Sequence, residues 1–511
     1  MKIQIHTAWK MNFTAALLGI FSALVLSAHA ADPQLSSWFT ANTGKYARYY
    51  TSVANRTAGL SATTWSGGQT SPTYAGVHEI DYSSNWVYIR NSGLASYVMG
   101  PSSNPNVPKN QGTATGAYRF PRGNVGVTNT AASKTLTSMG AIGKLVDGVS
   151  FYNTSDGYSY GTAHGADYAP PSMTLGDGIW NRDALPNESV SFDYALNHAQ
   201  PSGDYHSHAN PIAVRYQVGD NVNYDSPSKN YFENTNTLVF KHSPIIGWAN
   251  DGLPLYGPYG YSNPTNRASV VRRMISGYVL RDGQHGTTNL GATGRTTLPA
   301  WAALAQNRSA ILSASQYGPN TNATYPPGHY SEDYDYLGDH SYTQGVTNAD
   351  GTFYDLNQYN ARWCVTPEYP NGTWAYFESV TSNGISWYPY HLGRWFLDSP
   401  TGGTTTLATM NADAPLTLYF KGATNLQEVL NSPVVNSANG NVTLAWSALE
   451  GGTYQVLVSS NLATWTTNLA LNLTATNNIA VTNETGVAAV NASRFYRIKR
   501  IAVAAFDSTG Y

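Results

Sequence analysis

Short segments in which apolar and polar residues alternate make up most of this chain, and clusters of Gly, Ser, Thr and Asn separate them. Residues 86–89, 140–143 and 148–153 show strand-like segments of this kind. Residues 242–261 contain two such segments on either side of an Asp251-Gly252 pair, which favours a tight turn between two strands. Alternation with a period of two residues is typical of strands that bury one face. The pattern therefore predicts a mainly β protein.

Helical spacing is scarce along the chain. The best candidate helix covers residues 299–307, because Pro299 suits the first turn of a helix. We therefore expect a large domain over residues 31–424 that resembles a β-sandwich and contains little helix.

The character of the sequence changes near residue 425, where aromatic residues become rare and Asn, Thr, Ala and Val dominate. Four alternating segments predict strands at residues 442–446, 453–459, 477–482 and 494–499. We expect a second, small β-sandwich over residues 425–502, followed by a tail at 503–511. This part resembles the small C-terminal sandwich modules of exported bacterial proteins, and nothing in it indicates chemistry.

The N-terminus has the three parts of a secretory signal peptide. Lys2 and Lys10 precede an apolar stretch at residues 13–26, and Ala28-His29-Ala30 places small residues where a signal peptidase cleaves. We expect residues 1–30 to be removed after Ala30 and the protein to be secreted or periplasmic. No later segment has the unbroken apolar length that a transmembrane helix requires.

Charge and cysteine content narrow the function classes further. Removing residues 1–30 takes away two lysines and no acidic residue, which leaves a net charge of about −4. A nucleic-acid partner would need a basic surface, and the sequence contains none. The single cysteine, Cys364, rules out an intramolecular disulfide, and its apolar neighbours favour a buried, unreactive thiol.

A cluster of histidines is the strongest chemical signal. His206 and His208 lie in Tyr205-His206-Ser207-His208, and residues two apart on a strand point to the same face. His198 comes before a turn-forming stretch, residues 201–204, that can fold one strand back on another. Three neutral imidazoles suit Zn²⁺, Cu²⁺ or Fe²⁺ better than Ca²⁺ or Mg²⁺. Three protein ligands also leave a coordination position for water or substrate.

The sequence around this cluster resembles the YHYH-domain family of exported bacterial proteins, named for a Tyr-His-Tyr-His motif. The resemblance covers most of residues 35–400, and Ser207 replaces the second tyrosine of the motif. The matching segments are Gly140 to Asn153 (with Asp147 for the family's Asn), Asp193, His198, His242-Ser243-Pro244 through Gly257-Pro258, Glu332-Asp333-Tyr334, Leu337-Gly338-Asp339, Asp355-Leu356-Asn357, Arg362 to Phe377, and Tyr388-Pro389-Tyr390. The resemblance implies a family but no reaction.

Several further residues are candidates for the same site. His242 occupies a position where the family also has histidine, so we expect either a fourth ligand or a hydrogen-bonded histidine at a strand start. Other residues could orient a ligand, act as a carboxylate ligand or general base, or simply hold turns: Asp193, Asp204, Tyr205, Asp251 and Glu368.

The sequence thus predicts a secreted metal-binding protein with a divalent transition metal, zinc or copper being favoured, and leaves open a metal-dependent reaction. The alternative is a non-catalytic protein that binds extracellular glycans or serves as a structural surface protein, because Tyr and Trp with low charge suit glycan stacking. Nucleophile-elbow, phosphate-loop and His-Glu-x-x-His motifs are absent from the sequence.

Overall fold

The computed structural model describes most of the chain between Asp32 and Ala502. The described residues are 32–40, 44–103, 105–112, 116–123, 134–169, 175–236, 240–338, 354–422, 433–436, 438–447, 453–474, 479–485 and 494–502. The predicted signal peptide at residues 1–30, the domain boundary at 424/425 and the tail at 503–511 lie outside these ranges. Within them, no helix has the length and apolar character needed to cross a membrane.

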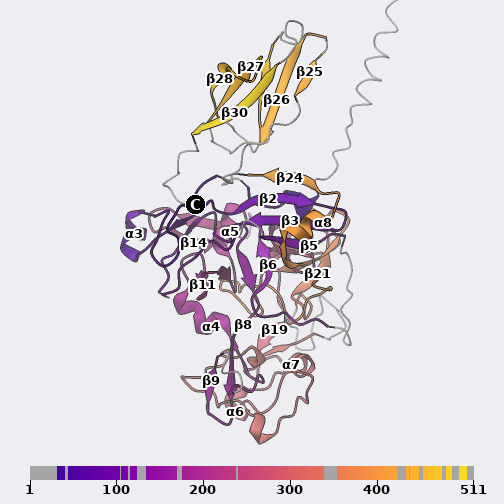
Figure 1. Ribbon diagram of the computed structural model, residues 1–511. Helices are drawn as coiled ribbons and strands as arrows, with labels where there is room; N and C mark the ends of the chain where they lie inside the picture. The colour runs from indigo at the N-terminus through magenta and orange to yellow at the C-terminus, as the bar shows by residue number, and fades with distance from the viewer. Residues whose placement is uncertain are drawn as a thin grey trace, which may run out of the picture.

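The described chain is mainly β, which confirms the predicted fold class (Figure 1). Its largest sheet has eight strands in the order β11-β12-β7-β6-β15-β16-β22-β21. These strands are β11 Asn197–Ala199, β12 Tyr205–Ser207, β7 Ser150–Tyr152, β6 Ala141–Leu145, β15 Ile245–Ala249, β16 Pro254–Tyr256, β22 Thr373–Phe377 and β21 Ala361–Cys364. Strand pairs β12/β7 and β16/β22 are parallel, and the other neighbours are antiparallel.

A five-stranded antiparallel sheet has the order β23-β5-β3-β2-β24. Its strands are β23 Gly403–Thr406, β5 Gly116–Pro121, β3 Trp86–Asn91, β2 Val77–Tyr82 and β24 Thr417–Lys421. Apolar side chains of this sheet, such as Val87 and Ile89, share one core cluster with Ile142, Leu145 and Phe151 of the eight-stranded sheet. The two sheets therefore enclose common interior space.

Smaller elements complete this part of the molecule. The helices are α2 Pro33–Ser36, α3 Val53–Ala58, α4 Ala184–Glu188, α5 Ile212–Gln217, α6 Leu290–Thr293, α7 Ala300–Ala305 and α8 Leu407–Ala412, with 3-10 turns η2 Ser189–Ser191, η4 Ala314–Gln316 and η5 Ser331–Asp333. The remaining strands are β1 Arg48–Tyr49, β4 Val98–Met99, β8 Ser155–Gly161, β9 Ala166–Tyr168, β10 Asn181–Asp183, β13 Val222–Asp225, β14 Asn230–Glu233, β17 Tyr259–Tyr261, β18 Val271–Arg273, β19 Tyr278–Leu280 and β20 Tyr334–Tyr336. Strand β9 and helix α6 lie at the end of this body that is opposite to β2 and β3 (Figure 1).

Several local predictions are confirmed. The helix α7 begins directly after Pro299, whose backbone is extended. Strands β15 and β16 form the hairpin predicted around Asp251-Gly252, and Gly252 has a positive φ of 81°. A side chain at Gly252 would also collide with the carbonyl oxygen of Pro121, so this turn requires glycine on two grounds. The lone Cys364 is buried.

Residues 434–502 form two three-stranded sheets, β25-β26-β29 and β28-β27-β30. Their strands are β25 Val434–Asn436, β26 Asn441–Ser447, β27 Thr453–Ser459, β28 Thr466–Thr474, β29 Ile479–Glu484 and β30 Phe495–Ala502. The four predicted strands correspond to β26, β27, β29 and β30. These sheets have an apolar cluster of their own, formed by Val442, Leu444, Trp446, Tyr454, Val456 and Ala480. Whether they form an independent domain stays a prediction.

Candidate metal centre

A short hairpin at the edge of the eight-stranded sheet brings the predicted histidines together. Strands β11 and β12 are antiparallel, and His198 lies directly opposite His206 in their register. The turn between them uses Gly203 with a φ of 90°, and a side chain there would collide with Lys109. His208 follows β12 by one residue and lies two residues after His206. The predicted fold-back of one strand onto another is therefore present.

The three histidines point their Nε2 atoms at one another. The Nε2 atoms of His198 and His206 are 3.0 Å apart, and those of His206 and His208 are 3.1 Å apart. All three side chains are buried, and their ligand atoms form a group that could hold a metal ion. Ligands at about 2.0–2.1 Å around a tetrahedral ion lie about 3.3 Å from one another. The spacing therefore fits a transition metal after a shift of a few tenths of an ångström.

Each Nδ1 atom has a partner that fixes the position of the imidazole proton. His206 donates from Nδ1 to the carbonyl oxygen of Asp204 at 2.9 Å, and His208 donates to that of Asn153 at 2.9 Å. Ser191 donates its hydroxyl hydrogen to the carbonyl oxygen of Glu188 at 2.7 Å, so its oxygen accepts from His198 Nδ1 at 2.7 Å. Carbonyl oxygens only accept hydrogen bonds, so the proton of each neutral ring is on Nδ1. Three Nε2 lone pairs consequently face one another.

Burial keeps the rings of His198 and His206 neutral. Burial, together with the nearby His208, lowers the pKa of His198 to about 4, although Glu188 opposes the shift. Burial also places the pKa of His206 well below its ordinary value, with the same sign of effect from His208 and His198. Neutral imidazoles whose lone pairs face one another at about 3 Å repel each other unless a cation lies between them. This arrangement could therefore hold a metal ion.

A carboxylate that the sequence reasoning missed completes the group. Glu188, the last residue of α4, places Oε2 3.1 Å from His208 Nε2 and 3.5 Å from His198 Nε2. This oxygen is buried and has no conventional hydrogen-bond partner within the described residues. Burial raises the pKa of Glu188, but its neighbours, among them the cationic Arg182, outweigh burial and hold this pKa below its ordinary value. Glu188 is therefore positioned as a charged fourth ligand.

The centre opens into a small cavity of about 110 Å³. Its lining includes the three histidines and Glu188, together with Asn106, Met139, Tyr152, Ser155, Asp156, Ala199, Gln200 and Pro201. The ring of Tyr152 stacks on that of His206, with centroids 3.9 Å apart and planes 15° apart. A water molecule or a small substrate group can thus reach the Nε2 side of the histidines.

The predicted supporting residues near the hairpin, Asp204, Asp193 and Tyr205, make different contacts. Asp204 fixes His206 through its backbone carbonyl, whereas its carboxylate accepts hydrogen bonds from Tyr152 (2.7 Å) and Ser150 (3.2 Å). Asp193 and Tyr205 instead bond to each other at 2.6 Å. Tyr205 precedes His206 on the strand, so its side chain is on the opposite face.

His242, Asp251 and Glu368 are not brought to this group. His242 donates from Nδ1 to the carbonyl oxygen of Ser243 at 2.8 Å, and its ring packs against aromatic rings, Tyr261 being 4.7 Å away between centroids. The carboxylate of Asp251 accepts from Tyr376 at 2.6 Å, and that of Glu368 accepts from Tyr256 at 3.0 Å. Of the two alternatives expected for His242, the structure shows the hydrogen-bonded histidine and not the fourth ligand, and Glu188 is the group that contacts the cluster.

Sequence signals existed for some of the missed residues. Glu188 and Ser191 lie ten and seven residues before His198, just upstream of the segment that drew attention. Asn153 ends one of the family motifs, but its contribution is a backbone carbonyl, which no residue type reveals. Tyr152 lies within the matching segment Gly140 to Asn153 but was not singled out as a site residue, and Asp156 had no local signal.

These features describe a β-rich protein in which a hairpin at the edge of a sheet presents a three-histidine group suited to a metal ion. The family model described as YHYH protein matches residues 117–388, more than half of the chain and including all three histidines. The chain belongs to the YHYH protein family. Comparisons with curated proteins and with solved structures found no match.

Proposed function

We propose that this is an exported metalloprotein that binds one divalent transition metal ion through Nε2 of His198, His206 and His208. The observation that carries the proposal is the convergence of three lone pairs whose protons are held on the far side of each ring. A hydrogen-bonding role alone would need a donor among the three Nε2 atoms. Neutral rings with Nδ1 protonated supply none.

The donor set favours zinc or copper. Three imidazoles and one carboxylate suit these ions, whereas Ca²⁺ and Mg²⁺ take mostly oxygen ligands. Such an ion, when bound, polarises a coordinated water or substrate oxygen. The open cavity is the feature that supports turnover over a purely structural role.

Asp156 is the candidate proton carrier of the same cavity. Burial raises the pKa of Asp156 to about 6, although Arg182, whose Nε donates to it at 2.5 Å, lowers it. A carboxyl group in this range exchanges protons near neutral pH. Its place in the cavity lining supports a role in proton transfer, and the substrate stays open.

Export is supported by the N-terminal pattern alone. A basic start, an apolar stretch at 13–26 and Ala28-His29-Ala30 form a cleavable signal. N-terminal sequencing of protein recovered from the periplasm or medium should begin at Ala31. An uncleaved N-terminus on protein retained in the cytoplasm would contradict export.

The test of metal binding is elemental analysis of protein purified without a histidine tag. We expect about one equivalent of zinc or copper in the wild type, and less than about a tenth in a His206→Ala, His208→Ala double variant. His242→Ala is the matched control and should keep its metal. Wild-type protein with less than about a tenth of an equivalent, unimproved by reconstitution, would reject the proposal and leave a structural or glycan-binding surface protein.

A further inference from the structure

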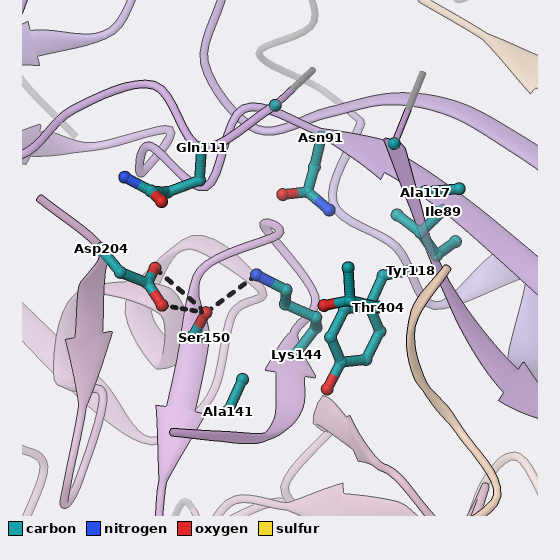
Figure 2. Close-up of a pocket in the computed structure, with 12 residues that line it drawn as sticks. Ile89, Asn91, Gln111, Ala117, Tyr118, Ala141, Lys144, Ser150, Asp204 and Thr404 are labelled. Carbon is teal, nitrogen blue, oxygen red and sulfur yellow. Dashed lines mark hydrogen bonds between the residues drawn. The ribbon is translucent and has the colours of Figure 1, made fainter. Parts of the chain in front are cut away.

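A second cavity, of about 260 Å³, lies between the two large sheets. The five-stranded sheet contributes Ile89, Tyr118 and Thr404 to its wall. The eight-stranded sheet contributes Lys144 and Ser150, which are direct partners on β6 and β7. The wall is completed by Asn91, Gln111, Gly112, Gly116, Ala117, Ala141 and Asp204 (Figure 2).

Lys144 is the most unusual group in this wall. Its side chain is buried, and its ammonium donates to Ser150 Oγ at 2.8 Å, the one hydrogen bond that the described part of the chain gives it. Figure 2 shows Lys144 reaching from its strand toward the space bounded by Asn91 and Asp204. An ammonium has three hydrogens to donate, and a buried one is costly unless they find acceptors. The cavity is therefore where oxygen acceptors are needed.

Asp204 supplies the opposite charge in the same wall. Ser150 donates its hydroxyl to the Asp204 carboxylate at 3.2 and 3.3 Å, so serine bridges the cation and the anion. Burial lowers the pKa of Lys144, while the charges of Asp204 and Asp147 raise it. One cation and one anion leave this wall without net charge. A charged ligand would place an uncompensated charge between the sheets, which is costly.

The rest of the wall is suited to hydroxyl groups. Asn91, Gln111 and Thr404 each offer both donors and acceptors, as a hydroxyl requires of its partners. Ile89 and the ring of Tyr118 add apolar surface that can cover C–H groups. The volume falls just below the range of about 300–1,000 Å³ found for pockets that take drug-sized ligands, which selects a single small unit.

We propose that this cavity binds a neutral polyhydroxylated molecule the size of one sugar unit. Its hydroxyl oxygens accept from the Lys144 ammonium, and its hydroxyl hydrogens reach the Asp204 carboxylate and the side-chain oxygens of Asn91 and Gln111. This site is separate from the metal centre. The two share Asp204, whose carboxylate lines this cavity and whose carbonyl oxygen holds His206.

The experiment is a saturation-transfer NMR titration of the full-length exported protein. The probes are D-glucose, D-galactose, D-mannose and myo-inositol, with D-gluconate and D-glucosamine as anionic and cationic counterparts. We expect saturable binding of at least one neutral probe. The charged counterparts should bind roughly tenfold more weakly or worse.

Substitutions locate the binding. Thr404 is exposed on edge strand β23, so Thr404→Trp blocks the cavity without disturbing the core and should abolish the signal. Thr417→Trp is the matched control, because Thr417 is exposed on β24 at the opposite edge of the same sheet. Lys144→Met should weaken binding roughly tenfold or more while metal content, measured separately, is kept.

The proposal is overturned if no neutral probe binds, if the charged probes bind as tightly as the neutral ones, or if Thr404→Trp binds like the wild type. A Lys144→Met protein that fails to fold does not weaken the test, because the Thr404 and Thr417 pair still decides it. Loss of metal with retained polyol binding, or the reverse, separates this site from the metal centre.

Discussion

Two buried histidine environments in this protein differ in what their Nε2 atoms face. His198 and His242 are alike in several respects: each donates from Nδ1 to an oxygen, and burial lowers the pKa of each to about 4. The Nε2 atom of His198 meets those of other histidines, a carboxylate and a cavity. The Nε2 atom of His242 is buried and unpaired within the described chain, among the rings of Tyr256 and Tyr261.

The difference shows that burial and a fixed tautomer do not make a metal site. Both environments have a buried ring with a fixed tautomer. The environment of His198 differs because several lone pairs converge there next to a carboxylate. A cavity beside the group adds access for solvent.

The largest contrast is between His206→Ala and His242→Ala. If four ligands share the roughly 10–16 kcal/mol of zinc affinity typical of such sites, one ligand accounts for about 2.5–4 kcal/mol. We therefore expect His206→Ala to weaken metal affinity roughly a hundredfold to a thousandfold, and His242→Ala to change it less than about threefold. Competition with a chromophoric chelator measures both. Equal losses in the two variants would erase the distinction.

His242 should instead affect how the free energy of unfolding changes with pH. Its pKa is about 4 in the folded protein, lowered first by burial and also by Arg362, against about 6.5 when unfolded. The unfolded chain thus binds the proton more tightly, so the stabilising contribution is present above pH 6.5 and is lost as pH falls toward 4. The shift corresponds to about 3 kcal/mol.

Unfolding of the wild type and of His242→Phe at pH 7 and pH 4.5 measures this effect, with exposed His164→Phe as the control substitution. The His242 variant should lose less stability on acidification than the other two proteins. Parallel losses in all three would show that His242 does not stay neutral on folding.

Glu188→Gln tests whether the carboxylate acts on the metal. The substitution keeps the shape of the side chain and removes its charge, so we expect metal affinity to fall roughly ten- to hundredfold. Glu368→Gln is the matched control, since Glu368 bonds Tyr256 near the other environment. Unchanged affinity in Glu188→Gln would remove this residue from the site.

Ser191→Ala has the smallest expected effect. Ser191 is the one side chain that fixes a proton on a histidine of the cluster, because the other two acceptors are backbone carbonyls. We expect about a tenfold loss of affinity, measured by the same chelator competition. Ser191→Thr retains the hydroxyl and should restore most of it. A null effect would mean that the tautomer of His198 is set in another way.

Sequence periodicity was sufficient for much of the fold. The alternation at 242–261 predicted the β15/β16 hairpin, and Pro299 predicted the start of α7, because turn and cap preferences act over a few residues. The arrangement of the two large sheets was harder to predict from the sequence. It depends on pairings between distant segments, such as parallel β16 and β22, that local patterns do not encode.

The residues of the candidate site also divide into those that local sequence predicts and those that depend on tertiary packing. His198, His206 and His208 were predicted from i, i+2 spacing and a turn, both of which are local. Glu188 lies at the end of α4, and Asn153 directly follows β7, the parallel neighbour of β12, so both contacts depend on tertiary packing. His242 was placed with the cluster on sequence position alone. His242 lies just before β15, which is separated from β12 by β6 and β7 in the sheet, so the alternative of a fourth ligand does not hold.

X-ray absorption at the metal edge of zinc-reconstituted protein counts the imidazole ligands of the bound ion. We expect three imidazoles with Zn–N distances of about 2.0–2.1 Å and an oxygen ligand at a similar distance. A spectrum with only oxygen ligands, or with fewer than two imidazoles, would contradict the assignment of His198, His206 and His208 as the metal centre.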